Sequence, residues 1–201
     1  MKRKILCTLA LITIISTSLF ASDTFYKQGD QKVTFNIGPS IPDFIYFFNT
    51  TGTTHPDNLY PGLDVLNVGG FGSVNFDFFY SPQNSLGIEV GYDFNYDKGD
   101  VLYSNVPIIG TYTYTPLQNG TWDFSLAAGL GLSFNTRDSQ TLLSLISTVK
   151  VNTTYFFNEN WGVGLTGGFY AAPNINYRSE LSDDNGIIAY SPVTLSLTFR
   201  N

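Results

Sequence analysis

Apolar side chains alternate with small or polar ones along most of this sequence. In residues 86–96, Leu86, Ile88 and Val90 are separated by Gly87 and Glu89, and the alternation continues to Tyr96. A period of two is that of a β-strand with one apolar face. The same pattern recurs, and we predict eight strands, at residues 32–37, 68–80, 86–96, 108–115, 122–135, 148–157, 161–169 and 193–199.

Two architectures produce such alternation. A soluble sandwich or lipocalin turns the apolar face inward, whereas a membrane barrel turns it toward lipid. The second face of these strands is rich in Gly, Ser, Thr and Asn, although water-facing strands favour long charged side chains. Aromatic residues such as Tyr112, Tyr114, Trp122 and Trp161 gather at strand ends, where membrane barrels carry interfacial girdles. We therefore predict an all-β protein, an eight-stranded antiparallel transmembrane β-barrel of the outer-membrane type with up-and-down topology.

The first 21 residues predict a secretory signal peptide. A basic start at residues 2–4 precedes an apolar or hydroxyl-bearing run at residues 5–20, and small residues close the segment. We expect cleavage after Ala21, with Ser22 as the alternative. Removing the three cations at residues 2–4 leaves seven of the ten Lys and Arg against sixteen Asp and Glu. This acidic balance argues against nucleic acid as a partner.

The remaining chain, residues 22–201, is expected to form one domain. The lone cysteine, Cys7, lies in the signal segment, so residues 22–201 offer no thiol for a disulfide or a metal site. Hydrophobic residues make up 43% of the sequence, yet no apolar run after residue 22 approaches the ~20 residues of a membrane helix. A barrel explains this combination.

Connection lengths predict the orientation in the membrane. Long and short connections alternate, with the short ones at residues 81–85, 116–121 and 158–160. Outer-membrane barrels have short periplasmic turns and longer outer loops. We therefore expect the short turns and both termini on the periplasmic side of the outer membrane of a diderm bacterium.

Two hairpins suggest a family. The segment VPIIGTYTYTPLQNGTWDFSLAAGLGLSF resembles the central hairpin of OmpW/AlkL-type proteins, with a proline before a strand that ends in an aromatic residue, a short turn and a Gly-rich return strand. The next hairpin, TVKVNTTYFFNENWGVGLTGGFY, is similar, with an Asn-rich turn that leads into Trp161. The resemblance implies an eight-stranded barrel with a narrow hydrophobic passage for small apolar molecules and a lateral exit into the membrane. The chain departs from the family pattern at its end, where Arg200 and Asn201 follow Phe199.

Charged residues also fall on the inward face of the predicted strands. The simplest interpretation is a network of ion pairs and hydrogen bonds that fills the barrel, and the alternative is a selectivity element or plug. Because eight-stranded interiors are largely filled by side chains, the structural role is favoured. The predicted lumen network is Lys32, Asp77, Glu89, Asp93, Asp123 and Lys150.

Five consecutive large residues, at positions 44–48, open the first long connection. They predict either an outer aromatic girdle or an apolar entrance for a hydrophobic solute. The entrance would combine Phe44, Tyr46 and Phe48 with the inward Phe71 and Ile146. At the other end of the chain, Val193, Leu195, Leu197 and Phe199 form a predicted signal for the outer-membrane assembly machinery.

Three functions remain open. The first is passive uptake of small hydrophobic molecules, and the second is a surface barrel whose loops bind host or other partners without transport. The third, a lipid-modifying enzyme, rests on His55 with Asp57 nearby, and no motif supports it. We expect no enzymatic activity, no catalytic residues, no metal and no cofactor, and the expected partners are outer-membrane lipid, the assembly machinery and small hydrophobic solutes.

Overall fold

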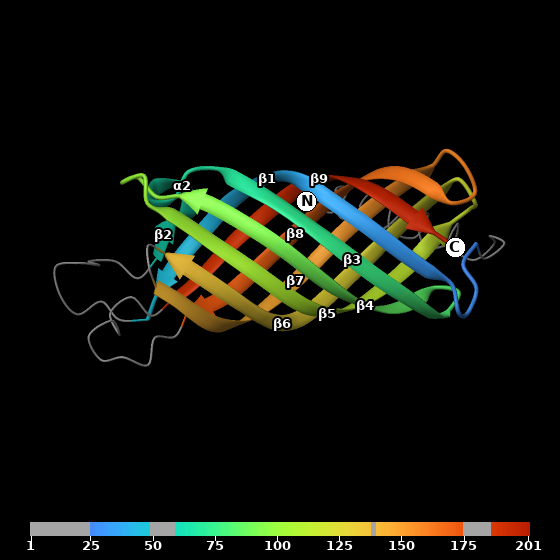
Figure 1. The fold of residues 1–201 in the computed structure, drawn as a ribbon, viewed down its shortest axis with the longest axis horizontal. Coiled ribbons are helices and arrows are strands. Elements are labelled where there is room, and N and C mark those ends of the chain that lie inside the picture. The colour runs from blue at the N-terminus through green and yellow to red at the C-terminus, as the bar shows by residue number, and fades with distance from the viewer. Residues whose placement is uncertain (1–24, 49–58, 138–139, 175–185) are drawn as a thin grey trace, which may run out of the picture.

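The computed structural model describes residues 25–48, 59–137, 140–174 and 186–201 (Figure 1). The predicted signal peptide, His55 and Asp57 lie outside these residues. Among the described residues, no helix has the length and apolar character needed to cross a bilayer. The elements are β1 (Gln31–Phe47), β2 (Leu59–Pro61), α2 (Gly62–Val65), β3 (Gly69–Ser81), β4 (Asn84–Tyr96), β5 (Leu102–Gln118), β6 (Trp122–Arg137), β7 (Gln140–Phe156), β8 (Trp161–Asn174) and β9 (Gly186–Arg200).

The long strands close into a barrel. Each pairs antiparallel with its neighbours in chain order, and β1 pairs with β9 to complete the circle. The three-residue β2 pairs only with β1, along Phe44–Tyr46, so it extends the rim and leaves eight strands in the wall. The predicted eight-stranded antiparallel barrel is therefore confirmed.

The strands are strongly staggered around the barrel. Following paired residues from Lys32 on β1 through every strand returns to Pro42 on β1, ten residues further along. Such a shear tilts the strands, as Figure 1 shows, and leaves an interior that side chains can fill. Because of the tilt, residues that are paired between neighbouring strands lie at different positions along the barrel axis. The tilt therefore also determines which inward residues lie at the same level of the lumen.

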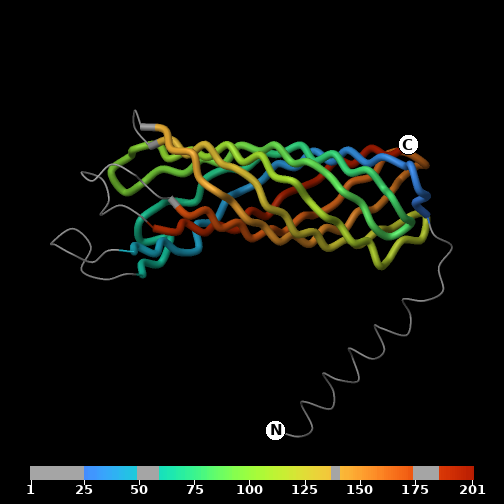
Figure 2. The backbone as a smooth tube through the Cα atoms, turned by 90° about the horizontal axis from the view of Figure 1, so that it is seen from below, coloured from blue at the N-terminus to red at the C-terminus, as the bar shows by residue number. Residues whose placement is uncertain are grey.

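The barrel has two unlike ends. At one, the turn end, the strands are joined by the short connections 82–83, 119–121 and 157–160. Both termini of the barrel lie there, because Lys32 pairs with Arg200 at the start of β1 and the end of β9. The opposite, loop end carries β2 and α2, which lie beside one another in Figure 2.

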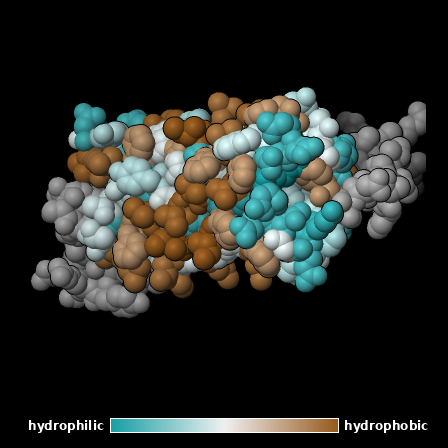
Figure 3. All heavy atoms as spheres, turned by 45° about the vertical axis from the view of Figure 1, so that its right-hand side comes forward, coloured by the Kyte–Doolittle hydropathy of each residue, from teal (hydrophilic) through white to brown (hydrophobic). Residues whose placement is uncertain are grey.

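Apolar side chains face outward and polar ones face inward. Leu130 is 75% exposed and Leu195 67%, whereas Glu89, Asp93, Thr154 and other inward polar residues are fully buried. Figure 3 shows apolar residues gathered over the middle of the outer surface, with hydrophilic ones toward the turn end. A soluble barrel would have the opposite arrangement, so the surface is that of a membrane barrel.

Strand boundaries differ from the sequence prediction. Residues 43–47, 116–118 and 173–174 were expected in connections, and they continue β1, β5 and β8. The wall strands are 13 to 17 residues long, whereas about 9–11 suffice to cross a bilayer. Their ends therefore extend past the apolar belt, where alternation no longer marks a strand.

Candidate functional site

The interior is built in layers, and the first closes the turn end. Tyr26, just before β1, is 1% exposed, and its ring stacks on Phe79 with centroids 4.0 Å apart. Its hydroxyl donates to Asp123 Oδ2 at 2.6 Å, and its backbone N–H donates to Gln118 Oε1 at 2.8 Å. Burial and the Asp123 carboxylate raise the pKa of the Tyr26 phenol well above its usual value, so it remains a donor.

A cation–aromatic contact seals the same end. The guanidinium carbon of Arg200 lies 3.7 Å from the ring centroid of Phe156 and also stacks on Phe25. The Arg200 Nε–H donates to the Glu159 carbonyl at 2.7 Å. Arg200 therefore has a structural role, because it joins the N-terminal segment to the barrel wall.

The second layer is a charged network in the turn half of the lumen. Lys150 Nζ forms an ion pair with Glu89 Oε2, and Lys32 Nζ lies 3.8 Å from Asp123 Oδ2. Asp77 accepts hydrogen bonds from Asn75 Nδ2 at 2.7 Å and from other neighbours. These charges are buried, so each needs a partner, and the network supplies one.

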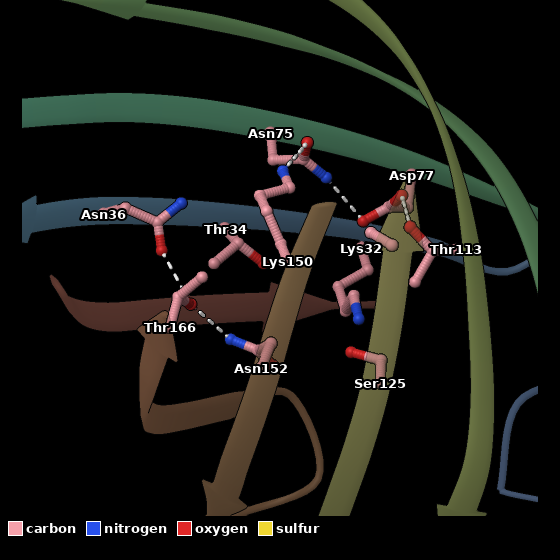
Figure 4. A pocket seen from close by; sticks show the side chains of 11 residues that line it. Lys32, Thr34, Asn36, Asn75, Asp77, Thr113, Ser125, Lys150, Asn152 and Thr166 are labelled. Atoms are coloured by element: carbon pink, nitrogen blue, oxygen red, sulfur yellow. Dashed lines mark hydrogen bonds between the residues drawn. The ribbon is translucent and has the colours of Figure 1, made fainter. Parts of the chain in front are cut away.

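A small polar cavity remains between the two lysines. Figure 4 shows Lys32 and Lys150 entering it from different strands, with Asn75 and Asn152 among its walls. Its volume is about 30 Å³, room for a water molecule or two. This half of the lumen is therefore closed to anything larger.

The third layer is apolar and lies closer to the loop end. Tyr170 and Tyr190 stack with centroids 5.2 Å apart and an interplanar angle of 7°, and Phe71 packs on Tyr170 at 5.3 Å. The Tyr170 hydroxyl donates to Glu89 Oε1 at 2.5 Å, which ties this layer to the charged network below. The complete buried cluster is Phe71, Ile109, Ile146, Tyr170, Ala172 and Tyr190. We call it the apolar layer.

Asp93 lies at the edge of the apolar layer. It pairs directly with Phe71 on β3 and with Asn105 on β5, and it is fully buried. Neither carboxylate oxygen makes a hydrogen bond of normal geometry, although the Ser40 hydroxyl lies beside it, and the buried Tyr190 hydroxyl has no partner. Near the rim, Ile45, Leu66 and Tyr103 form a further buried apolar cluster.

The wall itself is interrupted beside the apolar layer. The β7–β8 ladder runs from Phe156 and Gly162 to Ser147 and Ala171 and stops there. Both strands continue toward the loop end, β7 paired with β6 and β8 paired with β9. Among the described residues, the upper part of β7 is therefore not paired with β8, and Ile146 follows at once on the lumen side.

The sequence-predicted residues fall into three groups. The six residues of the predicted lumen network are all buried inside the barrel, and Phe71 and Ile146 meet in the apolar layer. The large residues at positions 44–48 do not all face the same side of the barrel wall. Tyr46 and Phe48 are exposed, Phe44 packs against Phe169, and Ile45 is the residue that turns inward. Phe44, Tyr46 and Phe48 thus stand outside the apolar layer.

Several contributors were missed. Tyr26 precedes the first predicted strand, and nothing local marks it as buried. Tyr170 and Tyr190 could have been found, because alternation continued backward from Val193 places Tyr190 on the inward face. Among the described residues, no group of three or more His, Cys, Asp or Glu could hold a metal ion.

Comparisons with known sequences identify a family and two relatives. The model of an uncharacterised protein family matches residues 17–199. An uncharacterised protein of Borreliella burgdorferi is 22% identical over 216 residues, which cover 96% of this chain and 94% of the relative. An uncharacterised protein of Treponema pallidum is 29% identical over 100 residues, 50% of this chain and 45% of the relative, so the match spans less than half of that protein.

Two solved structures share the fold. The outer membrane protein OprG of Pseudomonas aeruginosa has a TM-score of 0.58 at 10% identity, covering 89% of this chain and 98% of that one. Neisserial surface protein A has a TM-score of 0.58 at 11% identity, covering 85% and 98%. The chain therefore has the fold of small outer-membrane β-barrels.

Proposed function

The chain belongs to the protein family whose model spans residues 17–199, and we propose that it is an outer-membrane barrel that passes small apolar molecules from its loop end into the membrane. The interruption of the β7–β8 ladder beside the apolar layer carries this proposal. The OmpW/AlkL-type resemblance of the two hairpins agrees with this class of solute.

A route straight through the barrel is unfavourable for such a solute. Below the apolar layer it would meet the Lys150–Glu89 and Lys32–Asp123 pairs and a cavity of about 30 Å³. Separating a buried ion pair costs several kcal/mol, and an apolar molecule gives nothing in return. Tyr26 and Phe79 would then have to leave the turn end. A sideways exit avoids all of these obstacles.

The interruption in the wall offers that exit. The β7–β8 ladder ends at Ser147 and Ala171, and the described part of β8 continues beyond it to Asn174 without pairing with β7. Leu143 and Leu145 beside it are 55% and 66% exposed and suit contact with acyl chains. On the lumen side, Ile146 and Ala172 belong to the apolar layer. A solute leaving there would remain in apolar surroundings.

The proposal includes a location and an orientation. We place the loop end at the cell surface and the turn end with both termini in the periplasm, after removal of the signal peptide. Outer-membrane lipid would surround the apolar belt. The assembly machinery would recognise Val193, Leu195, Leu197 and Phe199, the first three of which are exposed on the outer face.

The test closes the proposed exit chemically. Leu145 and Pro173 stand on the unpaired parts of β7 and β8, and the chain after residue 21 has no cysteine of its own. The double variant Leu145→Cys with Pro173→Cys is joined by a bis-maleimide in vesicles with a lipopolysaccharide outer leaflet. Naphthalene entry, followed by fluorescence, is expected to fall to the rate of protein-free vesicles.

A second cysteine pair controls for the chemistry. Val149 and Phe169 are already partners in the ladder and both face outward, so joining Val149→Cys with Phe169→Cys should leave entry unchanged. Equal entry through the cross-linked and free forms of the upper pair would refute lateral passage. Wild-type vesicles no faster than protein-free ones would refute transport altogether.

A further inference from the structure

Asp93 differs from the other buried carboxylates of the barrel. Among the described residues, Glu89 and Asp123 each form an ion pair with a lysine, and Asp77 accepts several hydrogen bonds. Among the same residues, Asp93 has no ion pair and no hydrogen bond of normal geometry, and the Ser40 hydroxyl beside it is neutral, although Asp93 is fully buried. Leaving an ionised carboxylate buried without a partner is costly. Something outside the chain is therefore expected to complete this position.

Asp93 has an aromatic neighbour on one adjacent strand and a polar neighbour on the other. Its direct partners in the sheet are Phe71 on one side and Asn105 on the other. Phe71 packs on Tyr170, which stacks on Tyr190, whose buried hydroxyl also has no partner. One negative charge and one free hydroxyl thus border the apolar layer.

This combination favours an organic cation over a metal ion. Calcium takes six to eight oxygen ligands and magnesium demands near-octahedral oxygen geometry, whereas the direct neighbour of Asp93 on β3 is Phe71, whose side chain has no oxygen. An ammonium group can instead donate to a carboxylate while it lies against aromatic faces. The hydrocarbon part of the same molecule would occupy the apolar layer.

We propose that Asp93 and the apolar layer form a binding site for small molecules that carry one ammonium group on an apolar body. This inference rests on the proposed function and extends its solute class to apolar molecules that carry one cationic group. Asp93 binds the ammonium group, Phe71 and the Tyr170–Tyr190 stack contact the apolar body, and the interruption between β7 and β8 lies beside the same layer.

The test compares two solutes that differ in one group. 2-Phenylethylamine is a cation at neutral pH, and 2-phenylethanol has the same body without the charge. Titration of each into the detergent-solubilised barrel is expected to show the amine binding at least about tenfold more tightly, the worth of a charge-assisted hydrogen bond in a buried site. Asp93→Asn should remove this preference.

Asp64→Asn is the matched control, because Asp64 lies exposed on α2 at the loop end and its loss changes the net charge equally. It should leave the preference intact. Equal affinity of the wild type for both solutes would overturn the inference, and this comparison needs no variant to fold. Heat released by sodium or calcium chloride alone and lost in Asp93→Asn, with none for the amine, would also overturn it, in favour of an inorganic ion.

Vesicle entry separates this inference from the proposed function. If 2-phenylethanol enters faster than into protein-free vesicles while the amine shows no Asp93-dependent advantage, the inference fails and the transport proposal stands. If the amine binds in an Asp93-dependent way and neither solute enters, the site is real and the transport proposal fails.

Discussion

Loss of the Lys150 ammonium should destabilise the barrel strongly. Lys150 pairs with Glu89, whose side chain is fully buried, and its Nζ also lies 3.4 Å from Asn75 Oδ1. In Lys150→Met, Glu89 keeps only the hydrogen bond from the Tyr170 hydroxyl. Breaking a buried pair by removing one partner costs about 3–5 kcal/mol, and the free energy of unfolding should fall by that amount.

A second substitution tests the cause. Adding Glu89→Gln removes the unpaired charge and retains an acceptor for Tyr170, so the double variant should recover at least about 1 kcal/mol of the loss. Lys98→Met is the control, because Lys98 lies exposed in the 97–101 connection, where its ammonium group donates to Asn67 Oδ1. We expect it to change stability by less than about 0.5 kcal/mol.

The measurement is urea unfolding in phospholipid vesicles. The chain has two tryptophans, Trp122 and Trp161, both exposed on the outer face, so their emission follows loss of lipid contact. The heat-modifiable mobility of folded barrels on gels supplies an independent readout. A midpoint for Lys150→Met equal to that of Lys98→Met would refute the reasoning. So would a double variant whose loss is the sum of the two single losses.

Three further substitutions test other parts of the structure in the same unfolding assay. A Cβ on Gly131 would overlap the backbone of β5, whereas one on Gly167 would meet open space. Gly131→Ala should therefore lower the free energy of unfolding by about 1–3 kcal/mol, and Gly167→Ala by less than about 0.5 kcal/mol. Equal losses of stability would contradict this description of the packing. Leu130→Arg, on the apolar belt, should cost about 2–4 kcal/mol, and Leu130→Phe should be tolerated; a tolerated arginine would place this position outside the bilayer. Tyr26→Phe removes the hydrogen bond to Asp123 and should cost about 1–3 kcal/mol, and an unchanged midpoint would show that Tyr26 does not hold the turn end.

Alternation made the fold predictable because lipid and lumen impose opposite chemistry on the two faces of each strand. Leu86 and Glu89 differ in parity, and that alone places one in lipid and the other in the lumen. Parity could not locate strand ends, because residues beyond the apolar belt no longer need to alternate. This is why Ile45 was assigned to a connection although it continues β1 and packs inward.

The candidate site was predictable only in part. Parity placed Lys150, Glu89 and Asp93 inside, but the choice of partners depends on the stagger of ten residues around the barrel. That stagger brings Lys150 of β7 to Glu89 of β4, two strands with no shared ladder. The missing β7–β8 pairing likewise depends on how two distant ladders are aligned. Neither the stagger nor the end of the β7–β8 pairing can be predicted from a local sequence pattern.

The order of inward residues along the strands bears on whether Asp93 stabilises the fold. Along the inward face of a strand, a charged residue is followed by an apolar one closer to the loop end. On β3 these residues are Asp77 and Phe71, and on β7 they are Lys150 and Ile146. On β4, by contrast, Glu89 is followed by another carboxylate, Asp93, which unlike Glu89 makes no hydrogen bond of normal geometry. If Asp93 served stability, Asp93→Asn would lower the urea midpoint. Because a neutral amide of the same shape is easier to bury than an unpaired carboxylate, we expect that variant to gain about 1 kcal/mol or more, and a loss would show that Asp93 is a structural residue.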